Sequence, residues 1–326
     1  MNIRSAAAAL AYLVPAALAP HYATAQEYPT RSIALVVPFS PGGTTDIIGR
    51  LVSAQLEGDL GEPIVVENRA GAGATVGSTV VASEEPDGYT LLLSNSASHG
   101  VSPAVYSALP YDPVADFAHI ALLGQVPQYL IVRNDLGVES ISDLIEMARS
   151  RSGELNIGTA GEGSMGHLAS ELLMMSADVA MVRIPYGGTA DATQGLLSGE
   201  VDMIFSNPPS ARPLVDADEV TLLAITGEER DEVYPDVPTL KESGMQDFVT
   251  YAWYGFSAPA GTPSEIVERL NAVVLERLQD PTLQERLGEL GVSPPPPYTP
   301  EEFTDFVARN VAAFSAVAKE AGIQLD

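Results

Sequence analysis

Three glycine-rich turns contain the residues of this chain that are best suited to chemistry. They cover residues 41–46, 158–164 and 185–189, and each follows a short apolar run and precedes a predicted helix. Backbone N–H groups at the start of a helix lack partners within the helix and lie at the positive end of its dipole. Glycine lets a ligand approach that backbone closely, so each turn could hold a carboxylate or a phosphate. Three such turns in one chain predict a ligand cleft.

The elements that would position these turns alternate between strand and helix. From Tyr28 onward, helices are expected at about 45–57 and 74–83, and a second α/β unit follows them. The pattern is typical of parallel, doubly wound sheets. The predicted strands lie at 33–37, 64–66, 90–94, 129–132, 155–158, 180–184, 201–205 and 221–226. Because ligands bind outside the carboxyl ends of such strands, Ser94, Asn95 and Ser96 should share a rim with the first turn.

Hydroxyl side chains mark three further helix starts. Ser140, Thr262 and Thr299 each precede an acidic residue three positions later, which is the spacing of a capping box. The helix after Thr262 should bury one apolar face. That face consists of Val267, Leu270, Val274 and Leu278.

The composition describes a globular protein that is large enough for two packed α/β domains. Its 326 residues are 46% hydrophobic and 18% charged. The absence of cysteine excludes disulfides, thiolate metal sites and cysteine catalysis. A net charge of −27 disfavours nucleic acid and anionic membranes as partners, so any anion must be captured locally. Only two of the 16 basic residues are lysines, and this acidic composition suggests a salt-rich habitat.

Residues 1–25 have the pattern of a secretory signal peptide. Arg4 supplies the positive charge, residues 6–18 form a short apolar core, and Ala23-Thr24-Ala25 is a cleavage site. A membrane anchor is the weaker alternative, because the apolar stretch is short and two prolines interrupt it. We therefore expect cleavage near Ala25 and a periplasmic mature protein.

Residues 161–166 match the G-x-G-x-x-G pattern of a dinucleotide site, since they follow a strand and open a helix. The acid that should end the next strand and bind the ribose is missing, because that strand ends in Ile184-Pro185-Tyr186. Neither a P-loop nor the G-x-S-x-G turn of many hydrolases occurs, and His99 and His119 lack partners at metal-ligand spacing. We therefore expect no cofactor, no metal and no catalysis, and an NAD(P)-dependent enzyme is the weaker alternative.

Two polar residues near the turns permit two interpretations each. His167 lies in the first turn of the helix that Ser164 opens, where it could hydrogen-bond an anion or be a buried capping residue. Asp46 could accept a hydrogen bond from the ligand or complement the dipole of its own helix. The sequence leaves both questions open.

Four segments of the chain resemble a known family. They are residues 36–46, 66–73, 86–92 and 235–239, with the sequences VVPFSPGGTTD, VENRAGAG, PDGYTLL and PDVPT. In their order and spacing they closely resemble the Bug family, the periplasmic solute receptors of tripartite tricarboxylate transporters. The resemblance runs from about Tyr28 to the final helix.

This resemblance implies a type II periplasmic binding protein fold, with two α/β domains around a central ligand cleft and two crossovers. Domain 1 would comprise residues 26–124 plus 248–326, and domain 2 would comprise residues 125–247. Family members typically hold a ligand carboxylate with backbone amides and ordered water at the first turn, and the opposing lobe closes over it. The predicted ligand-binding residues are Phe39, Pro41, Gly42, Gly43, Thr44, Thr45, Asp46, Ser94, Asn95, Thr159, Gly163, Ser164, His167, Tyr186, Gly188 and Asn207.

The resemblance also implies a function. The protein would be a monomeric receptor that binds a small mono-, di- or tricarboxylate and delivers it to the permease subunits of the transporter. A sensor that presents the acid to a signalling partner is the alternative. Gly187-Gly188 stands where relatives often have a lysine before the second glycine, so affinity here would rest more on neutral dipoles and water.

Overall fold

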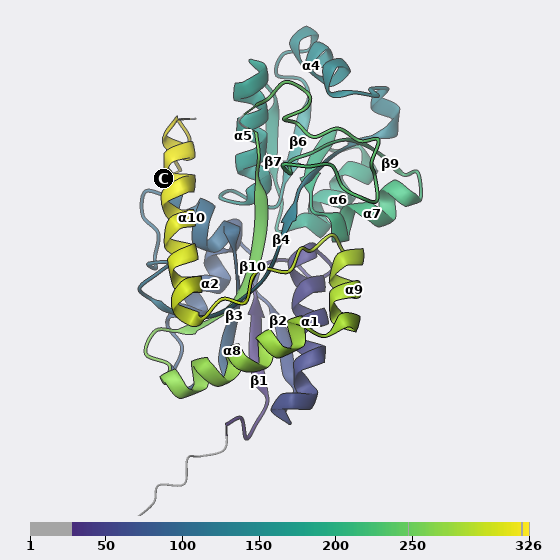
Figure 1. Ribbon diagram of the computed structural model, residues 1–326. Coiled ribbons are helices and arrows are strands. Elements are labelled where there is room, and N and C mark those ends of the chain that lie inside the picture. Colours follow the sequence, from purple (N-terminus) through teal and green to yellow (C-terminus); the bar gives the residue numbers. More distant parts are fainter. Residues whose placement is uncertain (1–27, 247, 321, 326) are drawn as a thin grey trace, which may run out of the picture.

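The chain forms two lobes, each built on a five-stranded sheet with helices on its faces (Figure 1). The computed structural model describes residues 28–246, 248–320 and 322–325, so the predicted signal peptide lies outside the described residues. In spatial order, the sheet of lobe 1 consists of β2 (Ile64–Asn68), β1 (Ile33–Val37), β3 (Thr90–Asn95), β10 (Tyr251–Pro259) and β4 (Phe117–Pro127). The sheet of lobe 2 consists of β7 (Val182–Pro185), β6 (Asn156–Thr159), β8 (Met203–Ser206), β5 (Tyr129–Arg133) and β9 (Val220–Ile225).

Helices cover both sheets. Lobe 1 has α1 (Thr44–Leu60), α2 (Thr75–Ala82), α3 (Ser102–Val105), α8 (Ser264–Leu278), α9 (Pro281–Glu289) and α10 (Pro300–Glu320), with the single turns η1 (Ala72–Ala74) and η2 (Ala97–Val101). Lobe 2 has η3 (Asn134–Leu136), α4 (Ile141–Ser150), α5 (Met165–Ala177), α6 (Thr189–Ser198) and α7 (Pro208–Asp216). The two-domain α/β fold is therefore confirmed.

Both sheets are mixed, so the prediction of parallel, doubly wound sheets is wrong in this respect. β10 runs antiparallel to β3 and β4, and β5 runs antiparallel to β8 and β9. Each of these two strands brings the chain into one lobe from the other. It therefore starts at the cleft and runs against the strands that end there. The other neighbouring strands pair in parallel.

The chain passes between the lobes at the junction of β4 with β5 and again on its way into β10. Tyr251 at the start of β10 pairs with Pro127 at the end of β4, so the two connecting segments lie side by side. This ladder continues beyond residue 124, where domain 1 was predicted to end, and the exact domain boundaries stay a prediction.

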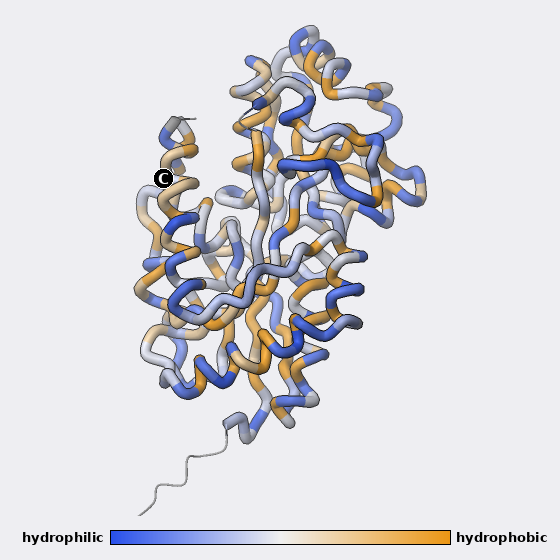
Figure 2. Tube along the Cα trace, viewed as in Figure 1, coloured by the Kyte–Doolittle hydropathy of each residue, from blue (hydrophilic) through white to orange (hydrophobic). Residues whose placement is uncertain are grey.

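Apolar residues fill the interior of each lobe, and Figure 2 shows hydrophobic colour along the strands and hydrophilic colour on outer turns. The interior strand β1 buries Ile33, Leu35 and Val37 completely. Burial of such side chains contributes about 1.5–3 kcal/mol each. The predicted apolar face of α8 is confirmed, since all four of its residues are buried.

Two of the three predicted capping boxes form. The Ser140 hydroxyl accepts a hydrogen bond from the Asp143 backbone N–H, and the Thr299 hydroxyl accepts one from the Glu302 N–H. The third prediction is wrong. Thr262 donates its hydroxyl hydrogen to the Pro259 carbonyl instead, and Pro263 is the N-cap of α8.

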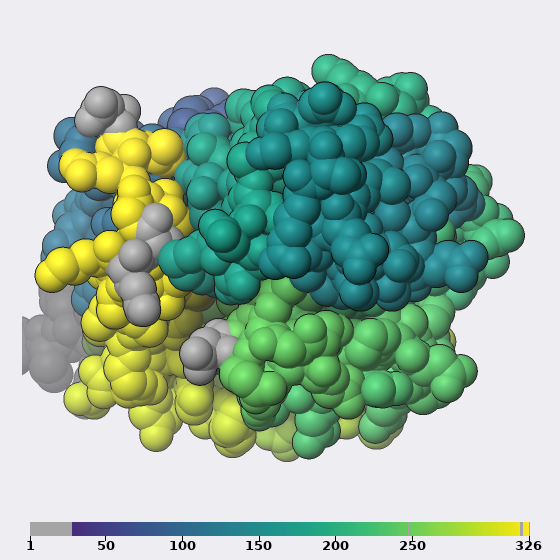
Figure 3. All heavy atoms as spheres, turned by 90° about the horizontal axis from the view of Figure 1, so that it is seen from above, coloured from purple at the N-terminus to yellow at the C-terminus, as the bar shows by residue number. Residues whose placement is uncertain are grey.

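The last helix, α10, packs against η2, α3 and β4 of lobe 1. In the view from above (Figure 3), α10 (yellow) lies next to the teal surface of lobe 2. Within the described part of the chain, we find no helix with the length and hydrophobicity needed to cross a membrane.

Candidate functional site

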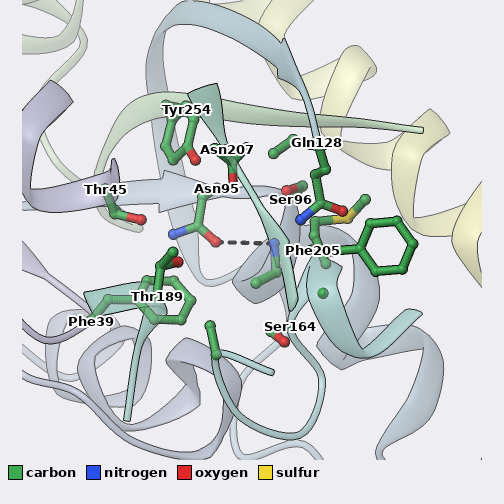
Figure 4. Close-up of a pocket in the computed structure, with 15 residues that line it drawn as sticks. Phe39, Thr45, Asn95, Ser96, Gln128, Ser164, Thr189, Phe205, Asn207 and Tyr254 are labelled. Carbon is green, nitrogen blue, oxygen red and sulfur yellow. Dashed lines mark hydrogen bonds between the residues drawn. The ribbon is translucent and has the colours of Figure 1, made fainter. Parts of the chain in front are cut away.

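A small, partly open cavity lies between the lobes, at the carboxyl ends of strands from both sheets (Figure 4). β1 and β3 lead to its lobe 1 wall through Phe39 and Asn95, and β8 leads to its lobe 2 wall through Asn207. This is the position predicted for a ligand in open α/β sheets. The cavity volume is about 40 Å³. Since one water requires about 10–15 Å³ on this scale, the closed lobes leave room for a compact ligand only.

Four helices begin at this cavity. The lining residues include Thr45 of α1, Met165 of α5, Thr189 of α6 and Asn207, the N-cap residue of α7. The start of a helix carries about half a positive charge. Among the described residues, none that lines the cavity is acidic or basic. The site therefore attracts an anion with helix dipoles and neutral polar groups.

The carboxylate of Asp46 is held within lobe 1. One oxygen, Oδ2, accepts hydrogen bonds from the Gly42 backbone N–H and from Arg50 Nε, both at 2.9 Å. The other, Oδ1, accepts one from Asn68 Nδ2 at 3.0 Å. Burial raises the pKa of Asp46, but the hydrogen bonds from Arg50, Gly42 and Asn68 outweigh it and hold the pKa below its usual value. Asp46 thus fixes the first turn and is not a lining residue.

The predicted site residues divide into two groups. Five of them line the cavity: Phe39, Thr45, Asn95, Ser164 and Asn207. The others are not among its lining residues: Pro41, Gly42, Gly43, Thr44, Asp46, Ser94, Thr159, Gly163, His167, Tyr186 and Gly188. Several of this second group build the turns behind the cavity. Ser94 lies in β3 instead, and its hydroxyl donates to the Gly255 carbonyl within the lobe 1 sheet.

His167 lies in the first turn of α5 and is not among the residues that line the cavity. Its Nδ1 accepts a hydrogen bond from the Gly163 N–H at 3.0 Å, and its side chain is 1% exposed. Burial, together with the nearby Arg183, lowers the pKa of His167 to about 4. The neutral ring therefore shapes the turn that Ser164 caps. His167 thus acts as a buried capping residue, which is one of the two interpretations that the sequence left open.

Ten lining residues are absent from the predicted ligand-binding residues. Those in lobe 1 are Ala97, Ala252, Tyr254 and Ser96, which was expected on the rim but not as a ligand contact. Those in lobe 2 or at its junction with lobe 1 are Gln128, Ala160, Met165, Gly166, Thr189 and Phe205. Ala160, Met165, Gly166 and Thr189 lie in or beside the predicted glycine turns. Gln128, Ala252 and Tyr254 come from the connecting segments, whose approach to the cavity no local pattern predicts.

Contacts around the cavity hold the lobes together. Ser40 Oγ donates to Asp191 Oδ2 at 2.6 Å, and the hydroxyls of Thr44 and Ser210 are hydrogen-bonded at 2.8 Å. On the other side, the Tyr106 hydroxyl donates to the carbonyl of Glu162 at 3.3 Å. Each pair joins lobe 1 to lobe 2, so the structure is a closed arrangement.

The residues do not favour a cofactor or metal site. β6 leads through the G-x-G-x-x-G turn into α5, and the next strand ends at Pro185 without an acid. A cavity of about 40 Å³ is also far too small for a dinucleotide. Within the described ranges, no three His, Asp or Glu side chains gather in a way that could hold a metal ion.

The comparison with protein families decides what kind of protein this is. Residues 48–323 match the family model described as the tripartite tricarboxylate transporter family receptor. The chain belongs to this family. It is 34% identical to protein BugT of Bordetella pertussis over 303 residues, which cover 93% of each chain. The resemblance to the Bug family is therefore confirmed.

Solved structures of relatives have the same fold. Rpa4515 from R. palustris, solved with adipate, is 36% identical with a TM-score of 0.88, and the match covers 91% of this chain and 99% of that one. MatC from Rhodopseudomonas palustris, solved with malate, is 36% identical with a TM-score of 0.86, covering 89% and 99%. Members of this receptor family are periplasmic binding proteins.

Proposed function

We propose that this protein captures a small organic carboxylate between its lobes and delivers it to the membrane subunits of a tripartite tricarboxylate transporter. The protein acts in the periplasm as a monomer and carries out no reaction on its ligand. The observation that carries the proposal is the convergence of four helix starts on an interlobe cavity with uncharged walls. Such a site binds anions by fixed dipoles.

The two lobes contribute different contacts to the ligand. The turn of residues 41–46, fixed by Asp46, receives the ligand on lobe 1, and the starts of α5, α6 and α7 add contacts when lobe 2 closes. A ligand can shift the lobes toward closure only by its higher affinity for the closed state. Contacts made across the cleft are therefore the ones that couple binding to closure. The closed form is the one that the membrane subunits would recognise.

Thermal unfolding and calorimetry with a panel of compounds test the binding part of the proposal. The panel contains mono-, di- and tricarboxylates, aromatic acids and NAD(P). We expect at least one acid to raise the unfolding temperature, because a ligand that binds only the folded state stabilises it. NAD(P) should have no effect. A nucleotide that binds while every acid fails would contradict the proposal.

A pair of valine substitutions locates the binding. Gly43 faces lobe 2, since a Cβ there would lie 3.5 Å from the Ala190 nitrogen, whereas a Cβ at Gly58 would meet no atom within 4 Å. Gly43→Val should abolish acid binding and Gly58→Val should leave it intact. Equal affinities in the two variants would exclude the first turn as the anchor.

Deletion of the gene separates transport from sensing. Cells without this protein should lose uptake of the bound acid and recover it on complementation. Unchanged uptake with a lost transcriptional response to the acid would instead support the sensor.

A further inference from the structure

The side chain of Arg212 joins lobe 2 to lobe 1 outside the lining of the cavity. Arg212 belongs to α7 of lobe 2 and is only 9% exposed. Its Nη1 donates hydrogen bonds to the backbone carbonyl of Gly288, at 3.2 Å, and to that of Glu289. These two carbonyls lie at the end of α9 in lobe 1, which is the negative end of that helix dipole. A guanidinium group of one lobe therefore binds the C-terminus of a helix in the other.

The rest of the Arg212 guanidinium is held within lobe 2. Its Nη2 donates to the two carboxylate oxygens of Asp231, at 3.0 and 2.8 Å, and its Nε donates to the Tyr129 hydroxyl at 3.3 Å. The Tyr129 hydroxyl in turn donates to Asp231. The five N–H groups of an arginine lie in one fixed plane, so these bonds determine where Nη1 points. Lobe 2 thus orients the guanidinium and leaves both N–H groups of Nη1 for lobe 1.

The ion pair of Arg212 and Asp231 lets this contact break without isolating a buried charge. Burial raises the pKa of Asp231, but hydrogen bonds from Tyr129, Val233 and Arg212 outweigh it and hold the pKa below its usual value. Both partners are therefore charged at neutral pH. A buried charge is costly unless it is paired and hydrogen-bonded. If lobe 1 moves away, Arg212 keeps Asp231 as its partner, and only Nη1 loses its acceptors.

The helix that carries Arg212 also closes the cavity. Its N-cap residue Asn207 lines the cavity, and the Ser210 hydroxyl is hydrogen-bonded to α1 of lobe 1 at 2.8 Å. Pro208 packs closely on lobe 1, since a Cβ added to Gly291 would lie 2.7 Å from the Pro208 Cβ. In Figure 1, α7 and α9 lie on the same side of the molecule, one in each lobe. The bonds from Arg212 to α9 therefore hold the start of α7 over the cavity.

We propose that Arg212 is a positioning residue that stabilises the closed arrangement of the lobes by binding the C-terminal end of α9. The contact forms when α7 approaches lobe 1 and breaks when the lobes part. A ligand then needs to supply less of the free energy of closure, so the contact raises the affinity for every acid by the same factor. This effect on affinity rests on the proposed function, whereas the effect on closure does not.

The test measures how often the lobes are closed. Since the chain has no cysteine, two introduced cysteines can carry spin labels at chosen places. The substitutions Val76→Cys in α2 and Val182→Cys in β7 suit this purpose, because both valines are exposed and belong to different lobes. Val76 follows η1, which lies against Glu162 of lobe 2, and Val182 adjoins Arg183, the ion-pair partner of Glu162. Pulsed electron spin resonance gives the closed-to-open ratio without acid and with malate, adipate or citrate.

Arg212→Met keeps a long side chain and removes the hydrogen-bond donors. It should lower the closed-to-open ratio about tenfold or more, because hydrogen bonds from a charged group are strong. Calorimetry should show that each acid bound by the wild type is bound more weakly by that same factor. Stopped-flow measurements should assign the loss to faster dissociation, because the open lobes still admit the acid. A residue that only stabilised the fold of lobe 2 would change neither the ratio nor the dissociation rate.

Arg133 provides the matched control. It also pairs with an aspartate of its own lobe, with Arg133 Nε 3.0 Å from Asp202 Oδ1, and within the described ranges it bonds to no residue of lobe 1. Arg133→Met should leave the closed-to-open ratio unchanged. If Arg212→Met fails to fold because Asp231 is left unpaired, the double substitution Arg212→Met with Asp231→Asn removes both charges. Arg133→Met with Asp202→Asn is then its control.

Three results would overturn the inference. The Arg212 variants could keep the wild-type ratio, which would mean that the contact persists when the lobes part. The Arg133 variants could lower the ratio equally, which would assign the effect to the stability of lobe 2. The wild type could show only the open distance in every condition. If the wild type closes but no acid binds it or shifts its ratio, the proposed function fails, and the distances without acid still decide the role of Arg212.

Discussion

Asp46 makes the first turn a rigid part of lobe 1. Its two oxygens join the Gly42 backbone, the half-exposed Arg50 and Asn68 of strand β2. The turn that would receive the ligand is thus fixed by three hydrogen bonds to one buried carboxylate. Its backbone N–H groups are positioned before any ligand arrives, which lowers the entropic cost of binding.

Asp46→Asn tests this role. The substitution keeps one acceptor oxygen but removes the charge, so the unfolding free energy should fall by about 1–2 kcal/mol. Calorimetry should show weaker binding of every acid by a similar factor. A changed ranking among hydroxy, amino and plain acids would instead mean that Asp46 reads the ligand. Arg50→Gln is the control, and its effect on stability should be below about 1 kcal/mol because Arg50 is half exposed.

His119 makes the stability of lobe 1 dependent on pH. The side chain is buried within hydrogen-bond distance of Ser257 Oγ and the Pro113 carbonyl. Burial lowers its pKa from 6.5 to about 4, although the hydrogen bond with Pro113 opposes the shift. Between pH 6.5 and pH 4 the unfolded chain binds a proton at this site and the folded chain does not. The contribution of His119 is therefore complete above pH 6.5 and is lost as the pH falls toward 4.

Chemical denaturation from pH 7 to pH 4 should detect this loss, which is on the order of 3 kcal/mol. His119→Gln cannot take up the proton, so its stability should fall less steeply over the same interval. Parallel curves for the two proteins would assign the acid sensitivity to other groups.

At the scale of elements, the closed lobes meet backbone to backbone. A Cβ added to Gly73 of η1 would lie 1.9 Å from the Glu162 carbonyl oxygen of lobe 2. Gly73 also has a φ of +58°, a conformation that costs other residues about 1 kcal/mol or more. Lobe 2 can therefore close over η1 only because position 73 has no side chain.

Gly73→Ala should prevent full closure while both lobes still fold. We expect acid affinity to fall at least about tenfold and the compaction seen by X-ray scattering on ligand addition to disappear. Gly137→Ala is a matched control, because Gly137 has a φ of +73° and a Cβ there would meet no atom within 4 Å. Equal effects of the two substitutions would mean that backbone strain, and not the clash, weakens binding.

Local sequence patterns predicted the positions of individual strands and helices well, but they did not predict the direction in which each strand runs in its sheet. β1 occupies the predicted residues, and α1 begins within one residue of its predicted start, directly after its N-cap residue Gly43. Strand direction in β5 and β10 depends on where the chain comes from, which no local sequence records. The same limit applies to the site. Phe39 and Ser164 lie in recognisable turns, but Gln128 and Tyr254 reach the cavity only through the path of the connecting segments.

At the scale of the whole molecule, the charge is strongly unbalanced. The chain has 43 acidic and 16 basic residues. Mutual repulsion among the acidic groups opposes the compact state. Salt screens this repulsion, with a screening length of about 10 Å at 0.1 M and about 3 Å at 1 M ionic strength.

We therefore expect the unfolding temperature to rise by several degrees between about 0.05 M and 1 M KCl. An uncharged osmolyte at equal osmolarity is the control, because it does not screen charge. Stability that is highest at low salt would contradict the idea that the composition reflects a salt-rich habitat.

The position of β10 between β3 and β4 also sets an order of assembly. The strands of lobe 2 come from one uninterrupted stretch, whereas the sheet of lobe 1 stays divided until β10 inserts between two strands made much earlier. Contacts that are distant in sequence form slowly. We expect pulsed hydrogen exchange during refolding to protect β6 and β8 before β3 and β4, and the reverse order would contradict this. A nascent chain would then hold a finished lobe 2 beside open strand edges, and this intermediate is the one most exposed to aggregation.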